Sequence, residues 1–267
     1  MRAVACDRTQ SSGDGFHLQT LLGRTSVALF ASLVFVASAC GQQSAPPAPQ
    51  SSDTTVKDKD SGANADAQAK GTSNDRLFFA LPNFLTLENA GQVPPLTSGQ
   101  KFKVVADSSF DPVVAVWYGA LAGISQAENS EPGYGQGAEG YGKRYGAAFA
   151  DGTIENFMTG AVLPSLLRQD PRFFQESSGG FAHRAGYAVS RAFITRSDSG
   201  RPQFNFSEVF GSAMSAAIST YSYHPHADRT VSNTATVWGS LVGYDTITFV
   251  VKEFWPDIRR KLHKNNQ

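Results

Sequence analysis

The sequence is poor in cysteine and in charged residues. Only two cysteines occur in 267 residues, and charged side chains make up 17% of the chain, against roughly 25% in typical soluble proteins. Basic and acidic residues number 23 each, so the chain has no net positive charge to attract a nucleic acid. Nucleic acid is therefore not expected as a partner.

The sequence also lacks the short motifs of common catalytic sites. It has no Gly-x-Ser-x-Gly elbow, phosphate-binding P-loop, dinucleotide-binding glycine pattern or His-Glu-x-x-His pair. The glycines between Gly133 and Gly142 do not follow a predicted strand, which argues against a phosphate loop. No cofactor is expected, and the sequence favours a non-catalytic protein while leaving catalysis open.

The N-terminal region has the order of an export signal. Arg24 is followed by an apolar run over residues 27–36, then by small residues and Cys40. The apolar run is shorter than the roughly 20 residues that span a bilayer. The pattern resembles a bacterial lipoprotein signal, in which the cysteine is acylated. Residues 1–39 are therefore predicted to be a signal peptide and Cys40 a lipidation site, with ordinary signal cleavage as the alternative.

Processing at this point would remove Cys6, so the mature chain is expected to contain no disulfide and no thiolate metal site. Residues 40–75 follow, and Val56 is their only large apolar residue. This composition predicts a disordered tether that spans roughly 30 to 36 Å as a coil. Residues 76–267 are then an exported domain, held at a membrane by the lipid and facing the periplasm.

The domain is predicted to be mainly α, a compact bundle of about five or six helices. The expected helices cover residues 113–129, 137–168 with a bend at Pro164, 181–193, 208–219 and 232–255, where Pro256 kinks or ends the last one. Asp111-Pro112 and Asp170-Pro171 each combine an N-cap residue with proline at the first helical position. One small hairpin is expected, with residues 192–195 and 203–206 flanking a turn at 197–200.

Small residues four positions apart predict close packing between helices. An interior helix glycine costs about 1 kcal/mol, and tight backbone contact is the simplest compensation. The glycines expected at such contacts are Gly119, Gly123, Gly142, Gly146, Gly239 and Gly243. The same spacing drives helix association in membranes, so a membrane-surface protein is a weaker alternative.

Several acids could supply the carboxylate pair of a glycan-acting hydrolase. This pool consists of Glu128, Glu139, Asp151, Glu155 and Asp245. Asp151 and Glu155 are four residues apart, which is more typical of a solvated helix face. Asp245 lies on an otherwise apolar ridge, where a buried ion pair with an arginine is expected; a pocket-lining acid with a shifted pKa is the alternative. The arginines considered as its partner are Arg144, Arg184 and Arg191.

The segment from His224 to Asp228 alternates possible metal ligands. His224, His226 and Asp228 could reach one divalent ion from an extended loop, but zinc sites usually need three or four protein ligands. A surface loop is therefore expected, and no metal site is predicted.

The C-terminal region from Arg259 to Lys264 is basic. Its cations are expected to interact with the carboxyl end of a helix. The alternative is a cationic patch that contacts anionic phospholipid or a cell-wall polymer.

Five strings together resemble a family of uncharacterised bacterial envelope proteins. They lie at residues 135–145, 156–158, 170–174, 195–200 and 252–257. The resemblance covers most of residues 76–264 and implies an envelope location. Because the family has no assigned activity, the resemblance implies no catalytic residue.

The sequence thus favours a lipid-anchored, non-catalytic envelope domain that acts through binding or structural contacts. Its expected partners are the membrane, through Cys40, and an envelope polymer or protein. The alternative is an envelope glycan hydrolase that uses paired carboxylates.

Overall fold

The structure is a computed structural model that describes residues 72–88 and 93–264. All described residues belong to one compact unit of the chain. The predicted signal peptide, Cys40 and nearly all of the predicted tether lie outside the described residues.

The described part of the chain is mainly helical, as predicted. Two short 3-10 helices, Pro132–Tyr134 and His226–Asp228, occur in connections, and a π-helical segment, Met158–Val162, joins α5 to α6. The α-helices are α3 (Ser98–Ser109), α4 (Pro112–Glu128), α5 (Gly137–Phe157), α6 (Leu163–Leu167), α7 (Phe181–Ser190), α8 (Phe206–Ser222) and α9 (Val231–Lys264).

Short strands connect the helices. Strands β1 (Arg76–Leu77) and β2 (Leu81–Pro82) pair antiparallel, and β3 (Thr86–Leu87) pairs parallel with β5 (Phe173–Phe174). The third sheet has the order β4-β6-β7, formed by Gln169–Asp170, Ile194–Ser197 and Pro202–Phe204. The β6–β7 pair is the predicted hairpin.

The two Asp-Pro pairs have different outcomes. Asp111 caps α4 as predicted, and its Oδ1 accepts a hydrogen bond from the Val113 amide at 2.9 Å. The helix start predicted at Asp170 is wrong. Asp170 lies in β4, which pairs with β6, and its carboxylate binds the Arg172 side chain and amide. These interactions replace helix capping.

The last long helix does not end at Pro256. An interior proline removes one helix hydrogen bond and its ring clashes with the carbonyl four residues earlier, yet α9 continues through Pro256, from Val231 to Lys264. Trp255, the residue before it, is fully buried, and its ring contacts Phe78 and Phe79. This packing holds the proline turn in place.

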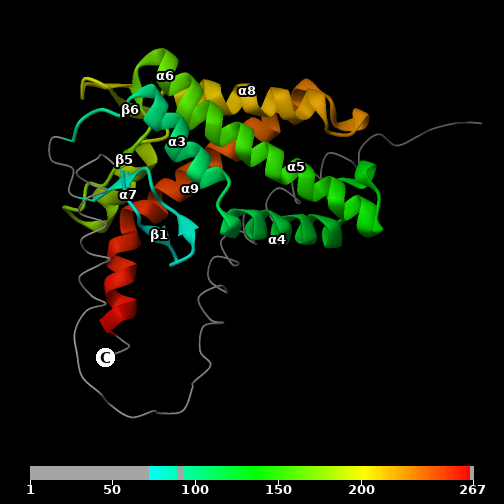
Figure 1. Cartoon of the computed structure of the whole chain (residues 1–267), viewed down its shortest axis with the longest axis horizontal. Helices are drawn as coiled ribbons and strands as arrows, with labels where there is room; N and C mark the ends of the chain where they lie inside the picture. The colour runs from blue at the N-terminus through cyan, green and yellow to red at the C-terminus, as the bar shows by residue number, and fades with distance from the viewer. Residues whose placement is uncertain (1–71, 89–92, 265–267) are drawn as a thin grey trace, which may run out of the picture. The chain divides into compact units, whose positions relative to one another are not determined.

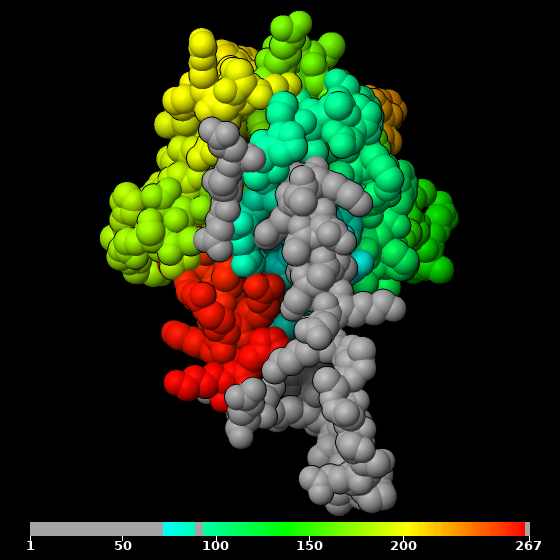
Figure 2. Space-filling view, turned by 60° about the vertical axis from the view of Figure 1, so that its left-hand side comes forward, coloured from blue at the N-terminus to red at the C-terminus, as the bar shows by residue number. Residues whose placement is uncertain are grey.

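The helices form a closely connected set in which α5 lies between α4 and α8 (Figure 1). Helix α9 packs against both α8 and α7. Figure 2 shows the β6–β7 hairpin, in yellow, at the same end of this unit as α3, in blue-green. Buried Lys101 of α3 fixes that arrangement, because its ammonium binds Asp198 of the hairpin turn at 2.8 Å.

Close glycine packing occurs, but mostly at other positions than those predicted. A Cβ atom at Gly211 of α8 would lie 3.2 Å from the backbone of Met158 and Thr159. Gly119 and Gly123 of α4 face the ring of Tyr141 rather than a backbone.

Four of the predicted packing glycines require correction. Gly142 and Gly146 on α5 and Gly239 and Gly243 on α9 are exposed. Within the described residues, a Cβ atom at any of the four would meet no neighbouring atom within 4 Å. The small-residue spacing therefore leaves open surface at these positions.

Candidate functional site

The interior between α5, α8 and α9 contains a cluster of ionisable side chains. Glu208 of α8 shares a hydrogen bond with Asp245 of α9, and Glu155 of α5 interacts electrostatically with both. Lys252, nearly two turns after Asp245 on α9, is a cation that interacts electrostatically with both Glu208 and Asp245. We call these four residues the carboxyl cluster.

Burial dominates the electrostatics of the carboxyl cluster. It raises the pKa of Glu208 well above the ordinary range, and the charge of Asp245 raises it further. Burial and the charge of Asp245 likewise raise the pKa of Glu155. For Lys252, burial lowers the pKa. The surroundings of the cluster therefore disfavour the charged forms of its carboxyl groups and of the Lys252 ammonium.

A second polar group extends along α5 from Glu155. Asp151 accepts hydrogen bonds from Ser219 at 2.5 Å and from the Tyr223 phenol, and its Oδ2 lies 3.3 Å from His224 Nε2. Burial alone would lower the pKa of His224, but Asp151 and the neighbouring Glu131 raise it on balance. The sequence assigned Asp151 to a solvated face, and the structure corrects this.

Two acids of the predicted pool lie apart from the others. Glu128 is exposed at the end of α4, and Glu139 forms an exposed pair with Lys143 at 2.7 Å. The structure brings together Asp151, Glu155 and Asp245.

The predicted arginine partners of Asp245 are wrong. Arg144 is buried, but it binds the carbonyls of Glu131 and Gly135, at 2.7 Å each, in the α4–α5 connection. Arg184 binds Glu253 and Asp257 of α9, at 2.8 and 2.6 Å. Arg191 lies over the Tyr187 ring. Lys252, on the same helix as Asp245, interacts with it electrostatically instead.

No metal site is found in the described part of the chain: no group of three or more His, Cys, Asp or Glu side chains there could hold an ion. His224 turns toward Asp151 and Glu131, whereas His226 begins the 3-10 helix that ends at Asp228. The three alternating residues therefore do not face one point.

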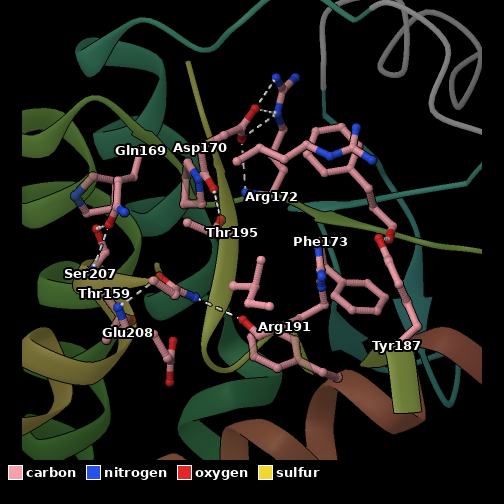
Figure 3. A pocket seen from close by; sticks show the side chains of 17 residues that line it. Thr159, Gln169, Asp170, Arg172, Phe173, Tyr187, Arg191, Thr195, Ser207 and Glu208 are labelled. Atoms are coloured by element: carbon pink, nitrogen blue, oxygen red, sulfur yellow. Dashed lines mark hydrogen bonds and ion pairs between the residues drawn. The ribbon is translucent and has the colours of Figure 1, made fainter. Parts of the chain in front are cut away.

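Glu208 also borders a small internal cavity of about 40 Å³ (Figure 3). The Oε1 atom of Glu208 is buried and has no hydrogen-bond partner in the structure. A cavity of this size and polarity has room for water but not for a sugar ring. The other acid that lines it, Asp170, is bound to Arg172 at 2.6 Å. The cavity therefore lacks the open carboxylate pair of a glycosidase.

The open recess bordered by Gly142 and Gly146 has a volume of about 470 Å³. Aromatic rings of Tyr134 and Tyr223 form much of its lining, and none of the candidate acids contributes to it. It offers apolar surface rather than a pair of catalytic groups.

Sequence reasoning missed Glu208 and Lys252. For Glu208 the sequence did contain a signal of a buried polar face, since polar or small residues recur every three or four positions along residues 207–220. In the structure, they form the buried face of α8. That face consists of Ser207, Glu208, Gly211, Ser212, Ser215, Ala216, Ser219 and Thr220.

The opposite face of α8 is apolar and points outward. We call its five residues the α8 ridge, and each of them exposes between 36% and 53% of its surface. They are Phe206, Phe210, Met214, Ile218 and Tyr221. An edge-to-face contact between Phe204 and Phe206, with ring centroids 5.0 Å apart, extends the ridge onto β7. Helix α8 therefore has the reverse of the polarity of an ordinary surface helix.

No protein-family model, curated protein or solved structure matches the chain. Among the described residues, no helix combines the length and the apolar character needed to cross a membrane.

Proposed function

We propose that the protein is a non-catalytic domain of the bacterial cell envelope, anchored through a lipid on Cys40, and that the α8 ridge lies on the bilayer surface. The reversed polarity of α8 is the observation that carries this proposal. A helix that buries serines and a glutamate while exposing aromatic and aliphatic side chains needs an apolar environment outside the domain.

A lipid surface fits the α8 ridge better than a polar protein surface. The ridge carries no charged side chain, and only the Tyr221 phenol offers a polar atom. From Phe206 to Tyr221 it extends for about 23 Å, the scale of an interfacial helix lying in the membrane plane. The predicted tether, roughly 30 to 36 Å as a coil, would keep the domain within reach of its membrane.

The carboxyl cluster supports the non-catalytic part of the proposal. Catalytic acids must reach a substrate, whereas Glu208 and Asp245 bond to each other between helices. Their neighbours Glu155 and Lys252 are drawn from the same helix interfaces. This arrangement suits a polar contact that fixes the register of α8 against α9.

The lipid anchor is tested by metabolic labelling with radioactive palmitate. The wild-type chain is expected to take up label, and Cys40→Ser is expected to lose it. Absence of label from the wild type, or label that survives in Cys40→Ser, would contradict the anchor.

The α8 ridge is tested by vesicle flotation with the unlipidated full chain carrying Cys40→Ser. This protein is expected to float with phosphatidylglycerol-containing vesicles. The double change Phe210→Ser and Met214→Ser should lower the bound fraction at least tenfold. Val116→Ser, which removes an exposed apolar side chain from α4, is the matched control and should leave flotation unchanged.

Three outcomes would contradict this function. Equal flotation of the ridge variant and the control would exclude the ridge as the contact. A stable dimer in solution, broken by the ridge changes, would assign the ridge to a second copy. Release of sugar from envelope glycan that stops in Asp245→Asn would favour the hydrolase.

A further inference from the structure

The hairpin end of the domain contains a second recess, of about 380 Å³, that the sequence analysis did not identify. Its lining includes Arg172, Phe174, Arg196 and Ser199. Strand pairing between β4 and β6 creates it, because Asp170 is directly opposite Arg196 in the register. We call it the arginine recess; two of its residues, Asp170 and Arg172, also line the small cavity drawn in Figure 3.

Both acids of the arginine recess are already neutralised. The Asp170 carboxylate accepts hydrogen bonds from Arg172 Nε, at 2.8 and 3.1 Å to its two oxygens, and from Nη2 at 2.6 Å. Asp198 holds the buried ammonium of Lys101 at 2.8 Å. Each of these two pairs is electrically neutral.

Arg196 contributes the remaining charge. Its guanidinium lies 4.4 Å from the centroid of the Phe174 ring. Among the residues that the structure describes, no carboxylate lies within ion-pair distance of it. A guanidinium held over an aromatic ring can keep N–H donors available and loses little freedom when it binds an anion.

The hairpin turn adds hydroxyl groups beside this charge. Ser197 and Ser199 both line the recess, and their Oγ atoms are 2.8 Å apart. Hydroxyls next to one guanidinium suit an oxyanion with a single negative charge and several acceptor oxygens. A volume of 380 Å³ exceeds that of a free inorganic anion and lies within the range of small-molecule sites.

The recess is joined to the α8 ridge by strand β7. Arg196 is paired with Pro202, and Phe204, two residues further along β7, makes an edge-to-face contact with Phe206 at the start of the ridge. If the ridge lies on lipid, the recess is placed at the level of the phospholipid headgroups.

We propose that the arginine recess binds the phosphodiester of a phospholipid headgroup, with Arg196 as its charged ligand. The inference rests on the proposed membrane-surface function. It adds a binding site with defined chemistry, a monoanionic phosphodiester, to a contact that is otherwise apolar.

The test is isothermal titration of the unlipidated full chain carrying Cys40→Ser with glycerophosphoglycerol, a soluble headgroup phosphodiester. Saturable binding is expected, and Arg196→Gln should weaken it at least tenfold. Arg201→Gln removes an exposed cation of the same hairpin and should change affinity by less than twofold. Arg196→Lys keeps the charge but loses the planar fork, and should weaken binding at least threefold.

Equal weakening by Arg196→Gln and Arg201→Gln would overturn the site in favour of general surface charge. If Arg196→Gln does not fold, the Arg196→Lys variant decides the test. An affinity of Arg196→Lys for the diester equal to that of the parent would overturn the proposed site. Binding of inorganic phosphate in preference to the diester would assign the recess to a free anion. Because the probe is soluble, this titration gives its result even where vesicle flotation fails, so the two proposals fail separately.

Discussion

Glu208 of α8 and Asp245 of α9 share a hydrogen bond inside the helical domain, and Lys252 interacts electrostatically with both. A hydrogen bond between two carboxyl groups requires one of them to hold its proton. The apolar α8 ridge lies on the other side of the same helix. Helix α8 thus joins a polar interior to an apolar exterior.

The proton held by the carboxyl cluster predicts a pH dependence of stability. Since the pKa of Glu208 is raised in the folded chain, the folded state binds more protons than the unfolded state above the ordinary glutamate pKa of about 4.3. The free energy of unfolding should therefore fall as pH rises from that value through the raised pKa. Glu208→Gln cannot ionise and should reduce the fall by about 1 kcal/mol or more.

Urea denaturation of the unlipidated chain between pH 4.5 and 8.5 measures this effect. Glu139→Gln, on an exposed helix surface, is the matched control and should follow the parent. If the free energy of unfolding changed with pH equally in Glu208→Gln and in the parent, Glu208 would ionise normally in the folded protein.

The open surface at Gly142 predicts a gain in stability from a side chain. Gly142→Ala should raise the free energy of unfolding by about 0.5 to 1 kcal/mol, because alanine favours the helix and meets no described neighbour. Gly211→Ala should lower it by about 1 to 3 kcal/mol, since its Cβ would press on the backbone of Met158. Thermal or urea denaturation of both variants measures these changes in the free energy of unfolding. Destabilisation by Gly142→Ala would contradict the open surface at this position and would support the close backbone packing predicted from the sequence.

The ion pairs between α7 and α9 predict a large loss of stability when the side chain of one partner is removed. Glu253 is fully buried and accepts hydrogen bonds from the amides of Glu176 and Ser177 as well as from Arg184. Arg184→Ala should cost about 3 kcal/mol, because it leaves a buried carboxylate without its cation. Lys143→Ala, which breaks an exposed pair, should leave the melting temperature nearly unchanged. A similar effect of both changes would mean that Glu253 is well solvated.

The contact between Asp151 and His224 predicts a raised imidazole pKa. NMR titration should place the His224 pKa above 6.5, and Asp151→Asn should lower it. The stability from this pair is complete below pH 6.5, where the imidazole is charged in both states, and is lost as pH rises through the raised pKa. An unchanged His224 pKa in Asp151→Asn would show that Asp151 is not what raises it.

Local signals predicted much of the fold. Asp111-Pro112 marked the start of α4, and the turn residues at 197–200 marked the hairpin. Helix α3 was missed because residues 98–109 mix glycine, lysine and serine without a clear apolar face. Its capping box, Thr97 with Gln100, was a usable signal.

The interior polar contacts could not be derived from helix periodicity alone. Periodicity assigns polar faces to solvent, whereas α8 turns its serines and Glu208 inward. The partner of Asp245 depends on the packing of α8 against α9, which no local pattern specifies. For the same reason, the small-residue spacing of Gly239 and Gly243 did not indicate whether another helix would cover it.

The most direct measurement of the central claim is the depth of α8 in a membrane. Spin labels would be placed on the full chain, with both native cysteines replaced by serine, at Met214 on the α8 ridge and at Glu139 on the polar surface of α5. With phosphatidylglycerol vesicles present, the account predicts that the label at 214 becomes more accessible to oxygen and less accessible to a water-soluble nickel chelate. The label at 139 should remain in water. Equal aqueous accessibility at both positions would contradict the claim that the α8 ridge lies on lipid.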